Sequence, residues 1–221
     1  MPIEESRESD STKHHVIISG TGRAGTTFLV QVLTELGLDT GFTDPYARIR
    51  GDRNAGMEST LRDNPAAPYI VKGPALCEEL GRILKQQKNL VIDHAIVPIR
   101  DLYSAAESRR TVARKGVPHF LAARSFLGIR KWRVRRPKEQ ESVLAQQFYR
   151  LIQTAAEHDI PITTLYFPRL AKDAEYLFDK INFLLNDISF GRFVQAFKKI
   201  SQPELIHDFV AGDSVAASVN I

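Results

Sequence analysis

The chain has 221 residues, 43% of them apolar, and a formal net charge of +4. This length fits one domain with a full core, and the positive charge favours an anionic partner such as a nucleotide or an acidic glycan. The one cysteine, Cys77, excludes a disulfide framework within the chain, and no apolar run approaches the roughly 18 residues that span a bilayer. With no apolar leader at the N-terminus, we expect a soluble, cytoplasmic protein.

Short apolar strands alternate with amphipathic helices along the chain. β-Branched and apolar runs predict strands at 16–19, 69–71, 90–99 and 162–167. Apolar residues at helical spacing predict helices at 25–36, 75–86, 101–114, 139–158, 173–185 and 190–199. This alternation predicts an α/β fold, with a central parallel sheet flanked by helices.

The domain organisation follows from composition. A polar, charged stretch predicts a flexible N-terminal tail at residues 1–13. A single domain is expected at 14–210, and a tail of small and polar residues at 211–221. Ligands of such sheets bind beyond the carboxyl ends of the strands, and the motifs described next fall at those ends.

A glycine-rich turn joins the first strand to the first helix, and it reads Gly20-Thr21-Gly22-Arg23-Ala24-Gly25-Thr26-Thr27. Glycines let backbone N–H groups turn toward a phosphate, and a helix N-terminus adds free donors. The turn fits the Walker A pattern at three positions, but Thr26 stands where that pattern has lysine. We predict a phosphate-binding, P-loop-type turn that differs from an ordinary ATPase or GTPase loop. The alternative is a glycine-rich turn that binds nothing.

A second phosphate-binding pair is predicted after the third strand. Arg100 ends that strand, and Ser108 lies about two turns into the next helix. The guanidinium fork matches phosphate oxygens, so Arg100 and the Ser108 hydroxyl can share one phosphate. Read singly, Arg100 is a salt-bridge partner of Asp101 and Ser108 a solvated serine.

These two motifs resemble those of sulfotransferases that use 3′-phosphoadenylyl sulfate (PAPS). The stretch from Gly22 to Thr27 is similar to that family's 5′-phosphosulfate loop, [KR]-[ST]-G-T-T, except that Ala24 replaces the serine or threonine. Arg100 and Ser108, eight residues apart, look like the family's 3′-phosphate pair. The likeness spans roughly residues 15–185. Many cytosolic members of the family have an Arg-Lys-Gly loop near the C-terminus, and this chain has none at that place. Arg114-Lys115-Gly116 has the same letters but stands in the middle of the chain.

The resemblance implies a sulfotransferase architecture, with PAPS as donor and a hydroxyl-bearing acceptor, such as a carbohydrate. Gly22, Arg23, Ala24, Gly25, Thr26 and Thr27 would then hold the 5′-phosphosulfate. Arg23 would also stabilise charge on the leaving phosphate, and Arg100 and Ser108 would hold the 3′-phosphate. Sulfuryl transfer requires no metal, and no metal site is expected.

The proton of the acceptor hydroxyl needs a base, and Glu58, Asp93 and His94 are the candidates. Glu58 lies in a loop where family members often carry an acid, whereas Asp93 and His94 stand at the opposite end of the sheet. Lys72 follows the second strand, at the ligand edge, and is a candidate for contacting the sulfonate or the acceptor. The alternative for Lys72 is an ordinary surface lysine.

Cations are dense in the basic segment 109–138, where Phe120, Phe126 and Trp132 are interleaved. In a sulfotransferase this insert would cover the acceptor site, and its charge favours an anionic saccharide. Nucleic-acid binding through cations and stacking aromatics is an alternative, and a solvated helix face is another. At the level of function, the alternatives are a P-loop small-molecule kinase or nucleotide hydrolase, or a non-catalytic member that binds nucleotide or nucleic acid.

Overall fold

The structure is a computed structural model of the chain. It describes residues 12–20, 22–47, 56–62, 64, 66–114 and 139–202, and for 110–114 it describes the backbone alone. Both expected tails, apart from Thr12 and Lys13, and residues 115–138 of the basic segment therefore lie outside the described residues.

A four-stranded parallel sheet forms the centre of the fold. Its strands are β1 (Lys13–Ile18), β2 (Ile70–Lys72), β3 (Leu90–Ile99) and β4 (Ile162–Tyr166), in the order β2-β1-β3-β4. All pairings are parallel, and the β1–β3 register shifts between His15 and Val16. Because the strands are parallel, their carboxyl ends meet at one edge of the sheet.

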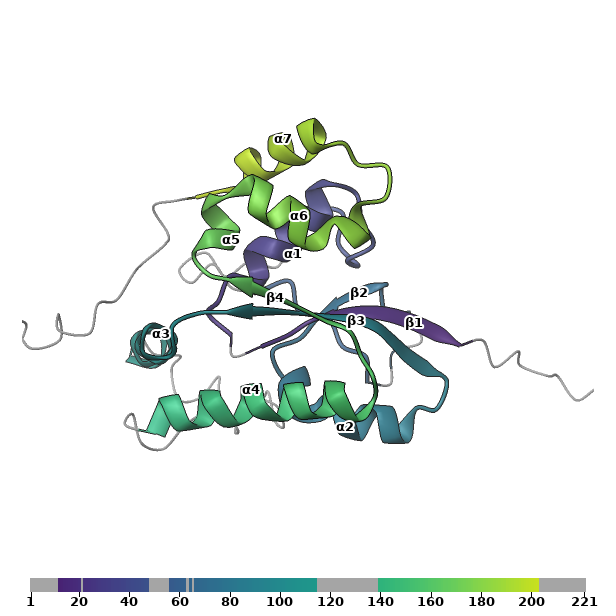
Figure 1. Ribbon diagram of the computed structural model, residues 1–221, viewed down its shortest axis with the longest axis vertical. Coiled ribbons are helices and arrows are strands. Elements are labelled where there is room, and N and C mark those ends of the chain that lie inside the picture. The colour runs from purple at the N-terminus through teal and green to yellow at the C-terminus, as the bar shows by residue number, and fades with distance from the viewer. Residues whose placement is uncertain are drawn as a thin grey trace, which may run out of the picture.

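Helices cover both faces of this sheet (Figure 1). One layer holds α1 (Thr26–Glu35), α5 (Arg169–Lys172), α6 (Ala174–Leu185) and α7 (Phe190–Ile200). The other holds α2 (Leu76–Gln86) and α4 (Gln140–Glu157), whereas α3 (Leu102–Arg114) lies beyond the arrowheads of β3 and β4. The expected α/β fold with a helix-flanked parallel sheet is confirmed.

The core has two halves because successive strand residues point to opposite faces. Val16, Ile18 and Ile96 pack toward α1, α6 and α7. Ile17, Val71 and Val97 pack toward α2 and α4. Burial on both faces explains why the runs 16–18, 70–71 and 95–97 are continuously apolar rather than alternating.

The strands and helices agree with the sequence prediction, with two differences. The first strand begins at Lys13 rather than Val16, because its polar start pairs with Leu90, Val91 and Ile92 of β3. The short helix α5 was not predicted, since four residues are too few to show helical periodicity. None of the described helices is both long and apolar enough to cross a membrane.

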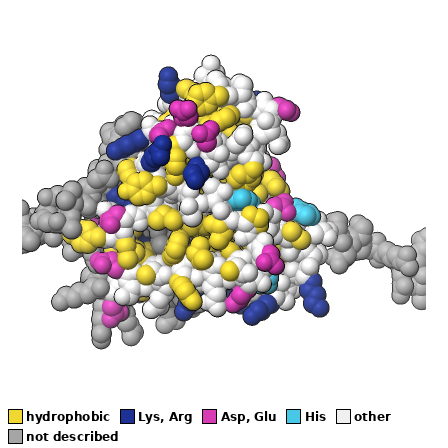
Figure 2. Space-filling model, in the orientation of Figure 1, with side chains coloured by type: hydrophobic (Ala, Val, Ile, Leu, Met, Phe, Trp, Pro, Cys, Tyr) yellow, Lys and Arg dark blue, Asp and Glu magenta, His cyan; other side chains and the backbone are white. Residues whose placement is uncertain are grey.

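One face of the molecule carries a group of hydrophobic side chains. Figure 2 shows hydrophobic side chains gathered in the middle of this face, where Figure 1 places β4 and α4. The exposed aromatic residues of β4, α4, α6 and α7 are Tyr166, Tyr149, Phe183 and Phe190.

Candidate functional site

The glycine-rich turn between β1 and α1 is described except for Thr21. Gly25 has a φ of 84°, a left-handed conformation that favours glycine. A Cβ atom there would lie 2.9 Å from Cδ2 of Phe167, which follows β4. Both the backbone conformation and the packing therefore require glycine at the start of α1.

The start of α1 is electrostatically open to an anion. No side chain caps this helix, and its first turn contains no acid. Thr26 and Thr27, which form that turn, are buried. The first turn of α1 therefore supplies no carboxylate of its own to balance the partial positive charge of the helix N-terminus.

Arg23 reaches from the turn to helix α3. Its Nε donates a hydrogen bond to Oγ of Ser108 at 3.0 Å. Arg23 also has a positive φ of 61°, which is uncommon for a residue other than glycine and costs conformational energy. The turn thus holds a guanidinium beside the buried Ser108 hydroxyl. This contact joins the glycine-rich turn to the Arg100–Ser108 motif, which lie far apart in the sequence.

Arg100 joins the same cluster from the end of β3. Its Nη1 donates to the backbone carbonyl of Arg23 at 3.3 Å. Its guanidinium carbon lies 4.9 Å from the centre of the Phe167 ring, within cation–π range. Arg100 thus contacts the backbone of Arg23, whose side chain contacts Ser108. Phe167 was not singled out from sequence, because nothing local marks its contact with Arg100.

The helix that carries Ser108 is anchored by Asp101. Its Oδ1 accepts a hydrogen bond from the backbone N–H of Ser104 at 2.8 Å, as expected of an N-cap. That hydrogen bond is the main reason why the pKa of Asp101 is lowered, and the nearby Arg100 charge adds to the effect. The cap fixes the first turn of α3 relative to the end of β3.

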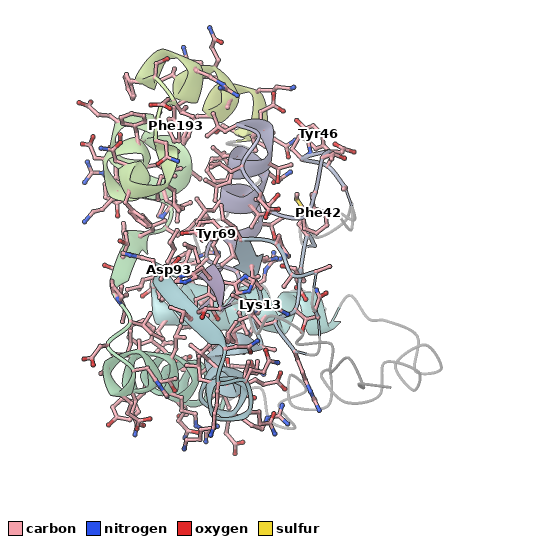
Figure 3. The ribbon with its side chains drawn as sticks, turned by 90° about the vertical axis from the view of Figure 1, so that its right-hand side faces the viewer. Lys13, Phe42, Tyr46, Tyr69, Asp93 and Phe193 are labelled. Atoms are coloured by element: carbon pink, nitrogen blue, oxygen red, sulfur yellow. The ribbon has the colours of Figure 1, made fainter. Side chains whose placement is uncertain are left out.

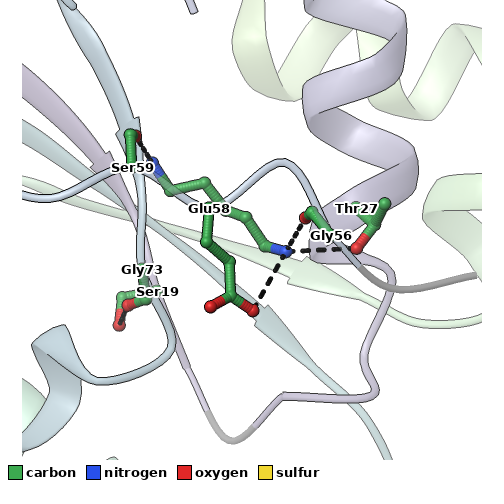
Figure 4. Close-up of polar contacts among 7 residues, drawn as sticks. Ser19, Thr27, Gly56, Glu58, Ser59 and Gly73 are labelled. Carbon is green, nitrogen blue, oxygen red and sulfur yellow. Dashed lines mark hydrogen bonds and ion pairs between the residues drawn. The ribbon is translucent and has the colours of Figure 1, made fainter. Parts of the chain in front are cut away.

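Lys72 extends from the end of β2 into the start of α1 (Figure 4). Its Nζ donates to Oγ1 of Thr27 at 3.1 Å and to the carbonyl of Gly56 at 2.6 Å. Only 3% of the side chain is exposed. The structure thus places a buried ammonium at the first turn of α1. It comes from β2, whereas the position of the turn that is lysine in the Walker A pattern holds Thr26. The surface-lysine alternative for Lys72 is wrong.

Burial lowers the pKa of Lys72 to about 8. The Glu58 carboxylate opposes this shift by favouring the charged ammonium, whereas the Arg23 charge adds to it. The Lys72 ammonium therefore has the Glu58 carboxylate as an ion-pair partner at 3.9 Å, and the charge of Arg23 on the glycine-rich turn also acts on it.

Glu58 lies beside Lys72 in the segment that precedes β2. Its Oε1 is 3.9 Å from the Lys72 Nζ, and 59% of its side chain is exposed. The neighbouring Ser59 fixes this segment, because its N–H donates to the Lys72 carbonyl and its Oγ accepts from the Lys72 N–H. A solvent-accessible carboxylate is thus held next to the buried ammonium.

The other two candidate bases have structural partners instead. Asp93 bonds His14 at 2.7 Å and the Tyr69 hydroxyl at 3.1 Å, and Figure 3 shows Tyr69 and Asp93 near each other. His94 bonds Thr163 and stacks on Phe183. Both residues therefore have structural contacts, with neighbouring strands in each case and, for His94, also with α6.

Two further residues of the sequence prediction are structural. Burial raises the pKa of the Cys77 thiol to about 12, so Cys77 is a packing residue and not a nucleophile. Arg109, at the start of the basic segment, is buried and donates to Gln147 of α4 at 3.1 Å. Gln147 donates in turn to Glu78 of α2, so a chain of hydrogen bonds links α3, α4 and α2. Because the Arg109 side chain is buried, it does not contribute to an exposed cationic surface.

The ends of β1, β2 and β3 thus contribute polar and charged groups around the start of α1, and Phe167, after β4, packs against them. The phosphate-binding candidates in this cluster are Gly22, Arg23, Ala24, Gly25, Thr26, Thr27, Arg100 and Ser108, with Lys72 and Glu58 beside them. No model of a known protein family and no curated protein matches the chain. Function is therefore inferred from the geometry of this cluster and from the motifs in it.

Proposed function

We propose that the protein is a sulfotransferase that moves the sulfuryl group of PAPS to an acceptor hydroxyl, in a P-loop-type architecture. The observation that carries the proposal is that Lys72 contacts Thr27 at the uncapped start of α1, while Arg23, in the turn before this helix, contacts Ser108. Each of these residues comes from a different strand end or helix. Cations beside an uncapped helix N-terminus favour an anionic ligand there.

The residues present fit the donor's two phosphate positions. Residues 22–27 present backbone N–H groups and Arg23 to the 5′-phosphosulfate, at the open end of α1. Arg100 and Ser108 hold the 3′-phosphate, and Arg23 lies between the two positions because it contacts both residues. When bound, the donor supplies the sulfuryl group and the phosphate that leaves.

The chain's own groups carry out the charge and proton chemistry. As the acceptor oxygen bonds to sulfur, the bond from sulfur to the 5′-phosphate oxygen breaks. Arg23 and Lys72 stabilise the negative charge that develops on that phosphate oxygen. Glu58 takes the proton of the acceptor hydroxyl, and the products are a sulfate ester and adenosine 3′,5′-bisphosphate.

A magnesium-dependent kinase or nucleotide hydrolase is less well supported. In a Walker loop the residue at the Thr27 position binds Mg²⁺ through its hydroxyl. Here that hydroxyl accepts a hydrogen bond from the Lys72 ammonium, so a protein cation already stands beside it. This arrangement favours transfer of a sulfuryl group, whose smaller charge needs no metal.

The proposal predicts that the protein forms adenosine 3′,5′-bisphosphate from PAPS when hydroxyl acceptors are supplied. Lys72→Met should lower the turnover number by about a hundredfold, since it removes a cation from the developing charge. Glu58→Gln should lower turnover while leaving donor affinity unchanged, because Glu58 acts on the acceptor. Bisphosphate release, followed by chromatography with and without chelator, is the measurement.

The matched control is Lys199→Met, which removes a lysine paired with Glu35 on α1, away from the loop. It should leave turnover unchanged. Consumption of ATP with magnesium, alongside inert PAPS, would instead identify a phosphoryl-transfer enzyme.

A further inference from the structure

A pocket of about 500 Å³ lies beside Glu58, between the segment that precedes β2, the turn after β2 and helix α2. Its volume is within the range of small-molecule sites. Phe42, labelled in Figure 3, lines it from the loop after α1, and Leu76 and Ile83 line it from α2. The pocket therefore has an apolar wall large enough for the face of a sugar ring.

Glu58 connects this pocket to the proposed transfer site. It lines the pocket, and its carboxylate is also 3.9 Å from the Lys72 Nζ. Gly73, which follows Lys72, lines the same pocket. A hydroxyl held in the pocket at Glu58 would thus lie next to the cation that faces the start of α1.

The polar groups of the pocket suit a polyol. Ser59, Thr60 and Asn64 line it from the segment that precedes β2. Within the described part of the chain, the charged side chains that line it are both carboxylates, Glu58 and Glu79. Two carboxylates repel an anionic acceptor and attract a cationic one.

Glu79 is placed to recognise a positive group. It lies in the first turn of α2, and 34% of its side chain is exposed. Its Oε1 is 3.5 Å from the Arg82 guanidinium, a partly exposed pair of the kind that contributes little stability. A carboxylate accepts about four hydrogen bonds, so Glu79 retains capacity for an ammonium group.

We propose that this pocket is the acceptor site and that the acceptor is an amine-bearing polyol of about disaccharide size. Its amine contacts Glu79, and its reacting hydroxyl contacts Glu58. This inference rests on the proposed function for the role of Glu58. It differs from the anionic acceptor that the basic segment predicts, because the charged side chains that line the described pocket are carboxylates.

Three β-1,4-linked disaccharides test the inference by calorimetric titration of the full chain: the glucosamine dimer, cellobiose and cellobiuronic acid. They share a skeleton and differ in amine or carboxylate groups. At a pH where the amines are protonated, the glucosamine dimer should bind at least about tenfold more tightly than cellobiose, and cellobiuronic acid should bind most weakly.

Glu79→Gln should weaken binding of the glucosamine dimer about tenfold. Glu78→Gln is the matched control, because it removes the same charge from the same turn but faces Gln147 of α4. It should change the affinity less than about twofold. The inference would be overturned if cellobiuronic acid bound most tightly, or if all three disaccharides bound equally or not at all. It would also be overturned if the two variants lost the same amount of affinity. Titration of adenosine 3′,5′-bisphosphate in the same samples tests the proposed function separately, since it needs no acceptor.

Discussion

Lys72 shows how one buried side chain links the stability of this protein to its proposed chemistry. Its ammonium is removed from water to contact Thr27 and the Gly56 carbonyl, and burial lowers its pKa to about 8. Below that pH the fold carries a buried charge, which costs stability. The proposed function needs the same charge beside the donor's phosphate, so we infer that this site sacrifices stability for binding.

This cost predicts a specific pH dependence. Between the folded pKa of about 8 and the ordinary value of 10.5, the unfolded chain binds more protons at Lys72 than the folded chain does. Stability of the wild type relative to Lys72→Met should therefore rise with pH, by about 2 kcal/mol between roughly pH 7 and pH 9.5. Urea denaturation of both proteins at each pH measures this difference. Parallel pH profiles for the two proteins would show that Lys72 titrates normally.

Single residues also mark the limit of the sequence prediction. Arg23, Arg100 and Ser108 could be singled out from sequence because their motifs are local. The contact of Lys72 with Thr27 spans 45 residues and depends on β2 pairing beside β1, which no local pattern specifies. The pocket beside Glu58 was missed for the same reason, since Phe42, Glu58 and Ile83 come from three segments.

At the scale of elements, α3 is the helix whose placement the proposed site depends on. It carries Ser108, and its first turn is fixed by the Asp101 cap. Asp101→Ala should destabilise the protein by about 1 kcal/mol, the usual cost of losing an N-cap. It should also weaken binding of adenosine 3′,5′-bisphosphate a few-fold, because Ser108 is then held less firmly.

Asp173→Ala is the control for this prediction. Asp173 caps α6, where its side chain accepts from the Tyr176 N–H, and α6 carries none of the proposed binding residues. Its loss should lower the melting temperature but leave the bisphosphate affinity unchanged. Equal effects of the two substitutions on affinity would mean that α3 has no special part in binding.

The elements themselves were largely predictable. The buried parts of the strands are apolar because helices cover both faces of the sheet, and the long helices show clear amphipathic spacing. The polar start of β1 escaped prediction because tertiary pairing holds it: His15 is buried and bonds the Pro68 carbonyl. Tertiary contacts of this kind override local propensity.

At the scale of the whole molecule, the parallel sheet brings the motifs together. The order β2-β1-β3-β4 places β1 between β2 and β3. The turn after β1 is therefore flanked by Lys72 from β2 and Arg100 from β3. The sequence predicts that these groups lie at the same edge of the sheet. Their order along that edge depends on the order of the strands, which the structure provides.

The most direct test of the proposed function is thermal stabilisation by adenosine 3′,5′-bisphosphate, compared with ADP with and without magnesium. At about 100 times its dissociation constant the bisphosphate should stabilise the fold by about 2.7 kcal/mol, which raises the melting temperature by roughly 5–10 °C. The effect should need no metal and should be lost in Arg100→Ala. Arg192→Ala, at the opposite end of α1, should retain it. Stabilisation by ADP with magnesium, and none by the bisphosphate, would contradict the sulfotransferase proposal.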